Sequence, residues 1–251
     1  MANGTRNPLF ATKPLKMLLD EMAGEHRLRR VLGPVSLTSL GVGANGATVL
    51  QTAWETGKST LSGSAYTPAA PGDFLYGSGG GTSTLFHEPG YQRAVVPPGL
   101  ANVNRAFPGR VVPDISMDGD PNTGFLVGQT QKFPDRDGGV QYDEYRIGGT
   151  SLSSPLFAGL MALADDFSGS AHGFINPSLY SLAGSSAITD VTHVKAADVR
   201  VDYNNGVDAK LGTTTSVRTF DFPGLAIATT PGYDNTTGLG VPNGVTFLRH
   251  I

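Results

Sequence analysis

The sequence predicts an α/β protein, and three observations support that fold class. Residues 15–28 place leucine and methionine near helical spacing with charged residues between them, which indicates an amphipathic helix. From about residue 40 the chain is rich in glycine and carries short apolar runs such as ATVLQTAW and GVTFL, which are typical of strands separated by turns. After Ser151 an apolar stripe at steps of three and four residues predicts a buried helix.

Length and composition limit the classes of function. At 251 residues the chain can form one large domain with a substantial core. Only 16% of its residues are charged, against about 25% in an average soluble domain, and the net charge of -3 gives no basic field for nucleic acid. No apolar run reaches the roughly 18 residues of a membrane span, and the N-terminus lacks the apolar segment of a secretory signal. We therefore expect no nucleic-acid or membrane partner, and no signal peptide is visible.

The remaining segments give weaker signals. Residues 61–110 are long and irregular, and their glycine cluster at 77–81 predicts a flexible surface loop, because no helix with a lysine follows to make a phosphate cradle. The run RVVPDIS is typical of a buried strand that ends at Asp114. Residues 196–229 alternate apolar and polar side chains, which predicts a β-hairpin insertion. The chain has no cysteine, so disulfides and thiolate metal sites are excluded.

The stretch GGTSLSSPLFAGL at residues 148–160 is the main candidate for chemistry. Pro155 is tolerated in a first helical turn, so the pattern predicts a helix that begins near Ser153 or Ser154. Ser151 then lies at the helix mouth, where free backbone N–H groups and the helix dipole would stabilise the oxyanion of acyl transfer. The alternative is that the hydroxyl side chains of this turn only cap the helix.

Three motifs in order make the first interpretation more specific. VPDISMDGDPNTGF, GGTSLSSPLFAGLMALADD and TTPGYDNTTGLGVPNG together resemble the sedolisin family of serine-carboxyl peptidases. The resemblance implies that residues 37–251 form the C-terminal part of a sedolisin-like peptidase domain. Residues 1–36 do not match the family, and their apolar spacing predicts that they are helical. It also implies a subtilisin-like fold, a mostly parallel sheet flanked by helices, that lacks its N-terminal strands. By resemblance, Ser151 is the nucleophile.

The catalytic partners that the resemblance implies are not recognisable in this chain. Sedolisins use a glutamate as the base, an aspartate four residues later, and another aspartate in the oxyanion hole. Glu21 and Glu25 have the spacing that puts two carboxylates on one helical face, but their surroundings do not match, and an ordinary solvated face is the alternative. The five histidines lack the context of a subtilisin-type base, so surface or satisfied histidines are expected.

The resemblance also implies a calcium site near the C-terminus. The motifs TDVT and TPGYD match the family's calcium loop, in which two aspartates and three backbone carbonyls surround the ion. Oxygen ligands of this mixed kind suit Ca²⁺. The alternative is two turn aspartates without a metal. By position, the expected ligands are Asp190, Val191, Thr230, Gly232 and Asp234.

These observations lead to a first hypothesis and its main rival. The first is a serine-type endopeptidase of the sedolisin type that hydrolyses peptide bonds at acidic pH through a Ser151 acyl-enzyme, with peptide or protein as substrate. The rival is a catalytically incompetent, calcium-stabilised, truncated relative that lacks the Glu and Asp partners. A third possibility is that the carboxylates arrive on another chain, a missing N-terminal half, so that this chain is one half of a split enzyme. A propeptide and an extracellular location are implied by the resemblance alone.

Overall fold

The computed structural model describes residues 52–104, 106–122, 124–132, 139–192, 198–204, 211–220 and 227–251. The predicted helix at 15–28 and the predicted boundary after residue 36 lie outside these residues. In the part of the chain that the structure describes, no helix is both long and apolar enough to cross a membrane.

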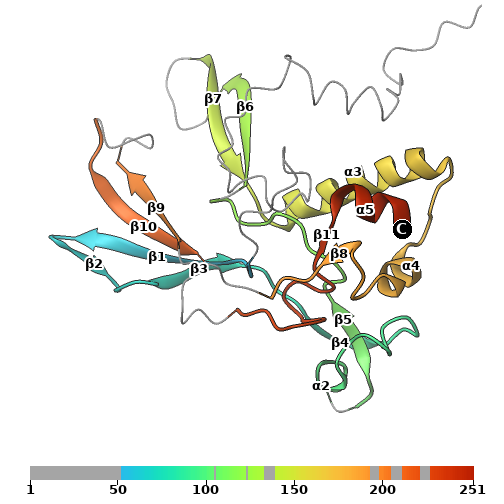
Figure 1. Ribbon diagram of the computed structural model, residues 1–251. Helices are drawn as coiled ribbons and strands as arrows, with labels where there is room; N and C mark the ends of the chain where they lie inside the picture. Colours follow the sequence, from blue (N-terminus) through green and yellow to red (C-terminus); the bar gives the residue numbers. More distant parts are fainter. Residues whose placement is uncertain are drawn as a thin grey trace, which may run out of the picture.

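The largest sheet is antiparallel and joins strands from distant parts of the sequence (Figure 1). Its central strand is β1 (Glu55–Ser62), which pairs along one edge with β10 (Thr214–Phe220) and along the other with β2 (Ala65–Thr67) and β3 (Asp73–Gly77). Strand β9 (Asp198–Tyr203) pairs with β10. The hairpin predicted within 196–229 is therefore confirmed.

Three small sheets each contain two antiparallel strands. They pair β4 (Gly81–His87) with β5 (Gly109–Val112), β6 (Phe125–Lys132) with β7 (Val140–Ile147), and β8 (Ile188–Thr189) with β11 (Val241–Pro242). Every strand pair between described residues is antiparallel, so these residues do not form the mostly parallel sheet that the resemblance implies. What is observed is a combination of helices and sheets, and the parallel sheet stays a prediction.

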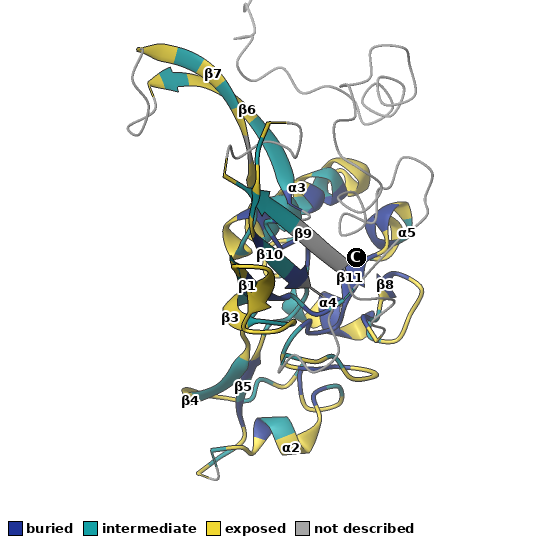
Figure 2. Ribbon diagram, turned by 90° about the vertical axis from the view of Figure 1, so that its left-hand side faces the viewer, coloured by how far each residue is buried: buried dark blue, intermediate teal, exposed yellow. Residues whose placement is uncertain are grey.

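The helices are α2 (Pro98–Ala101), α3 (Thr150–Ser168), α4 (Asn176–Ser181) and α5 (Gly244–His250). Helices α3 and α5 lie side by side in Figure 1. Figure 2 shows buried residues in α5, β8 and β11, whereas the β6–β7 hairpin is largely exposed or half-buried. The main core cluster contains Val96, Ala101, Val111, Leu160, Ala164, Leu179, Tyr180, Leu182, Ala187, Ile188, Tyr233, Leu239, Phe247 and Leu248.

Two expectations from local sequence are wrong. GVTFL, expected as a strand, forms most of α5, because Gly244, Phe247 and Leu248 are buried at helical spacing while Val245 faces solvent. Residues 61–110, expected as a loop, contain β2, β3, β4 and α2. Within the glycine cluster, a Cβ on Gly80 would lie 1.8 Å from the carbonyl oxygen of Asn235, so this backbone packs against another rather than moving freely.

Candidate active site

A tight turn between β7 and α3 positions Ser151. Gly149 occupies the N-cap position with φ 81° and ψ 172°, a conformation that is open almost only to glycine. Its N–H donates to the carbonyl of Gly119 at 2.5 Å, and its own carbonyl accepts from Leu152 at 2.9 Å and Ser153 at 3.3 Å. The helix therefore begins at Thr150, not at Ser153 or Ser154 as predicted, and Pro155 lies inside it.

The earlier start places Ser151 in the first turn of α3, where its side chain is exposed. Among the described residues, the N–H groups of Thr150 and Ser151 have no hydrogen-bond acceptor, as expected for the first turn of a helix. Two amide donors and the positive end of the helix dipole thus meet beside an accessible hydroxyl. This arrangement can stabilise negative charge on a bound oxygen.

The loop at residues 118–122 packs against this turn. A Cβ on Gly148 would lie 2.5 Å from the backbone nitrogen of Pro121, so the two backbones pack in direct contact. The Ser153 hydroxyl donates to the carbonyl of Asp118 at 2.7 Å. The first turn of α3 is therefore fastened to the loop through main-chain and side-chain hydrogen bonds.

A buried carboxylate lies within this loop. Asp120 is 7% exposed, and one of its oxygens accepts from the Asn122 N–H at 2.8 Å and from the Asn122 side-chain amide at 2.9 Å. Its other oxygen accepts from the Thr56 hydroxyl at 3.3 Å. Burial raises the pKa of Asp120, although these hydrogen bonds and the charge of Arg218 act in the opposite direction. Asp120 lies within the motif VPDISMDGDPNTGF, but nothing in the sequence alone indicates this buried cluster.

None of the described histidines or carboxylates is hydrogen-bonded to Ser151. The Ser151 hydroxyl makes no hydrogen bond with a described residue. His87 stacks on Phe107 with ring centroids 4.1 Å apart, and His172 pairs with Asp165 at 2.6 Å. His250 contacts the carbonyl of Thr246 at 2.7 Å. The described histidines are therefore satisfied elsewhere, as expected. Glu21, Glu25, His26 and His193 lie outside the described residues.

The residues of the predicted calcium site come together. Asp190 accepts a hydrogen bond from the N–H of Gly232 at 2.7 Å, and Asp234 accepts one from the N–H of Thr230 at 3.0 Å. Asp234 is buried and also accepts from the backbone N–H groups of Thr236 and Thr237 and from the Thr237 hydroxyl. These bonds bring the loop at 230–237 against residue 190, which follows β8.

This set has the chemistry that Ca²⁺ prefers. Within the described residues, Asp190 Oδ1 is buried without a hydrogen-bond partner, and the carbonyls of Val191, Thr230 and Gly232 accept no hydrogen bond. An orphaned carboxylate oxygen beside free carbonyls fits a hard cation. No cluster of three or more acidic, histidine or cysteine side chains occurs in the described ranges. The predicted set contains only two carboxylates, so its remaining ligands would be carbonyls.

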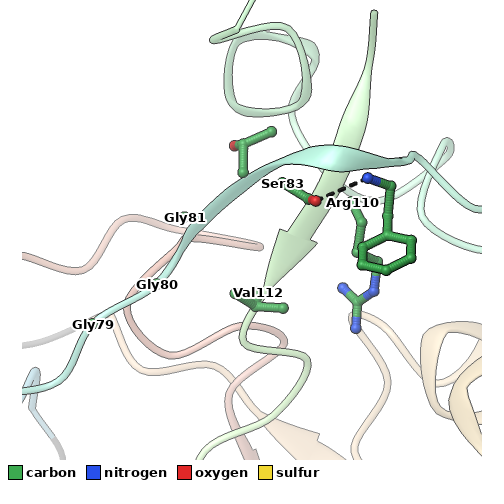
Figure 3. A pocket seen from close by; sticks show the side chains of 8 residues that line it. Gly79, Gly80, Gly81, Ser83, Arg110 and Val112 are labelled. Atoms are coloured by element: carbon green, nitrogen blue, oxygen red, sulfur yellow. Dashed lines mark hydrogen bonds between the residues drawn. The ribbon is translucent and has the colours of Figure 1, made fainter.

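A surface pocket lies between the glycine cluster and β5 (Figure 3). Its lining residues are Gly79, Gly80, Gly81, Thr82, Ser83, Phe86, Arg110 and Val112. The guanidinium of Arg110 is paired with Asp114, which also accepts from Tyr180 at 2.7 Å and Asn176 at 3.0 Å. Because its cation is already neutralised by a structural network and Ser151 is not among its lining residues, we assign this pocket no catalytic role.

Comparisons with known proteins agree with the motifs. No family model matches the chain. Kumamolisin of a Bacillus species is 34% identical over 175 residues, which are 69% of this chain and 25% of that protein. A probable tripeptidyl-peptidase of Arthroderma benhamiae is 33% identical over 181 residues, 67% of this chain and 26% of that protein.

Both of these relatives are peptidases, and their similarity to this chain is high enough to assign it to a family. The chain belongs to the sedolisin family, and it spans about a quarter of the length of these relatives. Among solved structures, Pseudomonas sedolisin, a serine-carboxyl proteinase complexed with pseudo-iodotyrostatin, is 26% identical with a TM-score of 0.48, over 83% of this chain and 43% of that one.

Proposed function

We propose that Ser151 is the nucleophile of a sedolisin-type endopeptidase that hydrolyses peptide bonds at acidic pH. The observation that carries this proposal is an exposed serine in the first turn of α3, beside two backbone N–H groups with no acceptor among the described residues. Membership of the sedolisin family supports a peptide or protein substrate.

The chemistry follows from this geometry. Ser151 Oγ would form a bond to the carbonyl carbon of the scissile peptide, and the carbonyl oxygen would take up the negative charge. The amides at the mouth of α3 would stabilise that charge. When the carbon–nitrogen bond breaks, the proton lost by the serine reaches the leaving amine through a general base. Water then hydrolyses the Ser151 ester and frees the hydroxyl.

The base that this reaction requires is not among the described contacts of Ser151. By resemblance it is a glutamate, which accepts a proton only while ionised, whereas an oxyanion-hole aspartate donates only while protonated. Because ordinary carboxyl pKa values are about 4, the two states occur together only in acid, where each group is partly ionised and partly protonated. The missing contact favours the second candidate, a catalytically incompetent relative of the peptidases, because a serine without its base loses orders of magnitude in rate.

Calcium would belong to the scaffold in either case. Asp190 and Asp234 would supply carboxylate oxygens, and Val191, Thr230 and Gly232 would supply carbonyls. Bound there, the ion would neutralise two neighbouring carboxylates and tie the loop at 230–234 to the end of β8. An extracellular location stays a prediction based on the resemblance.

One experiment separates the two candidates. The purified chain is incubated with a denatured protein from about pH 3 to about pH 7, alongside Ser151→Ala and Ser154→Ala. Ser154 is a matched control, since it is exposed in the same helical turn and its side chain makes no hydrogen bond to a described residue. Cleavage in acid that only Ser151→Ala loses supports the peptidase. Equal cleavage, or none, in all three proteins at every pH supports the incompetent relative.

A further inference from the structure

The loop at residues 118–122 lies between the largest sheet and the candidate nucleophile. On one side, a Cβ on Gly119 would lie 2.9 Å from the ring of Trp54, the residue just before β1. On the other side, a Cβ on Gly148 would lie 2.7 Å from the carbonyl oxygen of Gly119. The loop therefore has little room to move without displacing either β1 or the start of α3.

Two backbone carbonyls of this loop hold the turn that carries Ser151. The carbonyl of Gly119 accepts the N–H of Gly149, and the carbonyl of Asp118 accepts the hydroxyl of Ser153. These two bonds lie on either side of Ser151 in sequence. A change in the position of the loop would therefore change where the hydroxyl and the free amides point.

Three buried side chains fix the loop itself. Thr56 is 0% exposed, Asn122 6% and Asp120 7%. Asp120 bridges the other two by accepting from the Thr56 hydroxyl and from both N–H groups of Asn122, and the Asn122 side-chain amide also donates to the Thr56 hydroxyl at 3.4 Å. Arg146 of β7 donates to the carbonyl of Asn122 at 2.9 Å. The cluster thus connects β1, the loop and the strand that leads to Ser151.

We propose that Thr56, Asp120 and Asn122 are positioning residues for Ser151. Through the loop at 118–122 they hold the first turn of α3, and so they set the alignment of the serine with its amide donors. This inference rests on the proposed function for its catalytic meaning, but the alignment can be measured without catalysis.

The absence of cysteine from the natural chain provides a direct probe. Ser151→Cys introduces a single thiol, and a thiol at a helix N-terminus has a pKa below the free value of about 8.5. The thiol pKa is measured in the full chain from thiolate absorbance and from the pH dependence of alkylation by iodoacetamide. We expect a value about one unit below the free thiol, because aligned amides stabilise the thiolate.

Two comparisons between variants that also carry Ser151→Cys separate an effect of positioning on the thiol pKa from the effects of lost charge and of lost stability. Asp120→Ala and Asp120→Asn both remove the carboxylate charge, but only asparagine keeps an acceptor oxygen for the Asn122 amides. The thiol pKa should be about half a unit higher with alanine than with asparagine, because only alanine releases the loop.

The second comparison is neutral in charge. Thr56→Val and Thr219→Val each remove the hydroxyl of a threonine that is 0% exposed, on the neighbouring strands β1 and β10. The Thr219 hydroxyl donates to the carbonyl of Pro71, away from the loop at 118–122. We expect Thr56→Val to raise the thiol pKa and Thr219→Val to leave it unchanged, at similar losses in thermal stability.

The inference is overturned if alanine and asparagine at position 120 give the same thiol pKa, or if the two valine variants shift it equally. If Asp120→Ala does not fold, the valine pair decides alone. Failure of the proposed function gives a different result. No cleavage then depends on Ser151, but the expected differences in thiol pKa between the variants at positions 120, 56 and 219 are still observed.

Discussion

A single methyl group at Gly148 should disturb the candidate active site. The Cβ of Gly148→Ala would lie 2.5 Å from the nitrogen and 2.7 Å from the Cα of Pro121. These distances are roughly 1 Å shorter than an ordinary contact of about 3.5 Å, and both opposing atoms are backbone atoms that cannot rotate away. The loop at 118–122 or the start of α3 must therefore move.

We expect Gly148→Ala to lower the free energy of unfolding by about 1–3 kcal/mol, the usual cost of overpacking. The matched control is Gly159→Ala within α3, where a Cβ would meet nothing within 4 Å. That change should raise stability by about 0.5–1 kcal/mol, because alanine is the better helix former. The two substitutions add the same atom and should act in opposite directions.

Urea unfolding followed by tryptophan fluorescence measures both variants. Trp54 is the single tryptophan, and it packs against Gly119 in the loop that Gly148→Ala should displace. The emission of folded Gly148→Ala should therefore differ from that of the natural protein, while Gly159→Ala should match it. A Gly148→Ala protein as stable as the natural chain, with unchanged emission, would refute the packing of Gly148 against the loop.

Three further predictions follow from buried polar groups. Because burial raises the pKa of Asp120, this carboxyl group stabilises the fold most below about pH 4, and its contribution is lost as the pH rises through the raised pKa. Urea unfolding at several pH values should therefore show a smaller loss of stability with rising pH in Asp120→Asn than in the natural chain. Removal of calcium present at a hundredfold excess over its Kd should lower the free energy of unfolding of the natural chain by about 2.7 kcal/mol, which calorimetry detects as a lower Tm. The same chelation should leave the Tm of Asp190→Asn unchanged. Gln92→Met should cost about 1–3 kcal/mol in urea unfolding, because it leaves the backbone N–H and carbonyl of Val111 without their partner.

Local patterns in the sequence predict several features well. The helix after Ser151 and the hairpin within 196–229 both follow from the spacing of apolar side chains, and both are present. The position of Ser151 near the start of a helix also follows from neighbouring residues, although the helix begins at Thr150 and not at Ser153 or Ser154. In each case the determining interactions lie within one element or one turn.

Features that depend on distant contacts are the ones that local patterns miss. Val245 and Thr246 favour a strand, yet the burial of Phe247 in the main core cluster makes the segment a helix. The glycines at 77–81 suggest a loop, but Gly80 packs against the backbone of Asn235, more than a hundred residues later. Neither contact leaves a signal in the local spacing of residues.

The same distinction explains why local sequence points to Ser151 as the candidate nucleophile but does not reveal the residues that support it. Asp120 occurs in DGDPNTG, where aspartate, proline, asparagine and glycine are ordinary turn residues. In the folded chain it is buried, and its carboxylate accepts a hydrogen bond from Thr56, 64 positions earlier. A buried acid in a loop that contacts the start of α3 is therefore a tertiary feature, and the substitutions that test the alignment of Ser151 lie in a segment that local sequence describes as an ordinary turn.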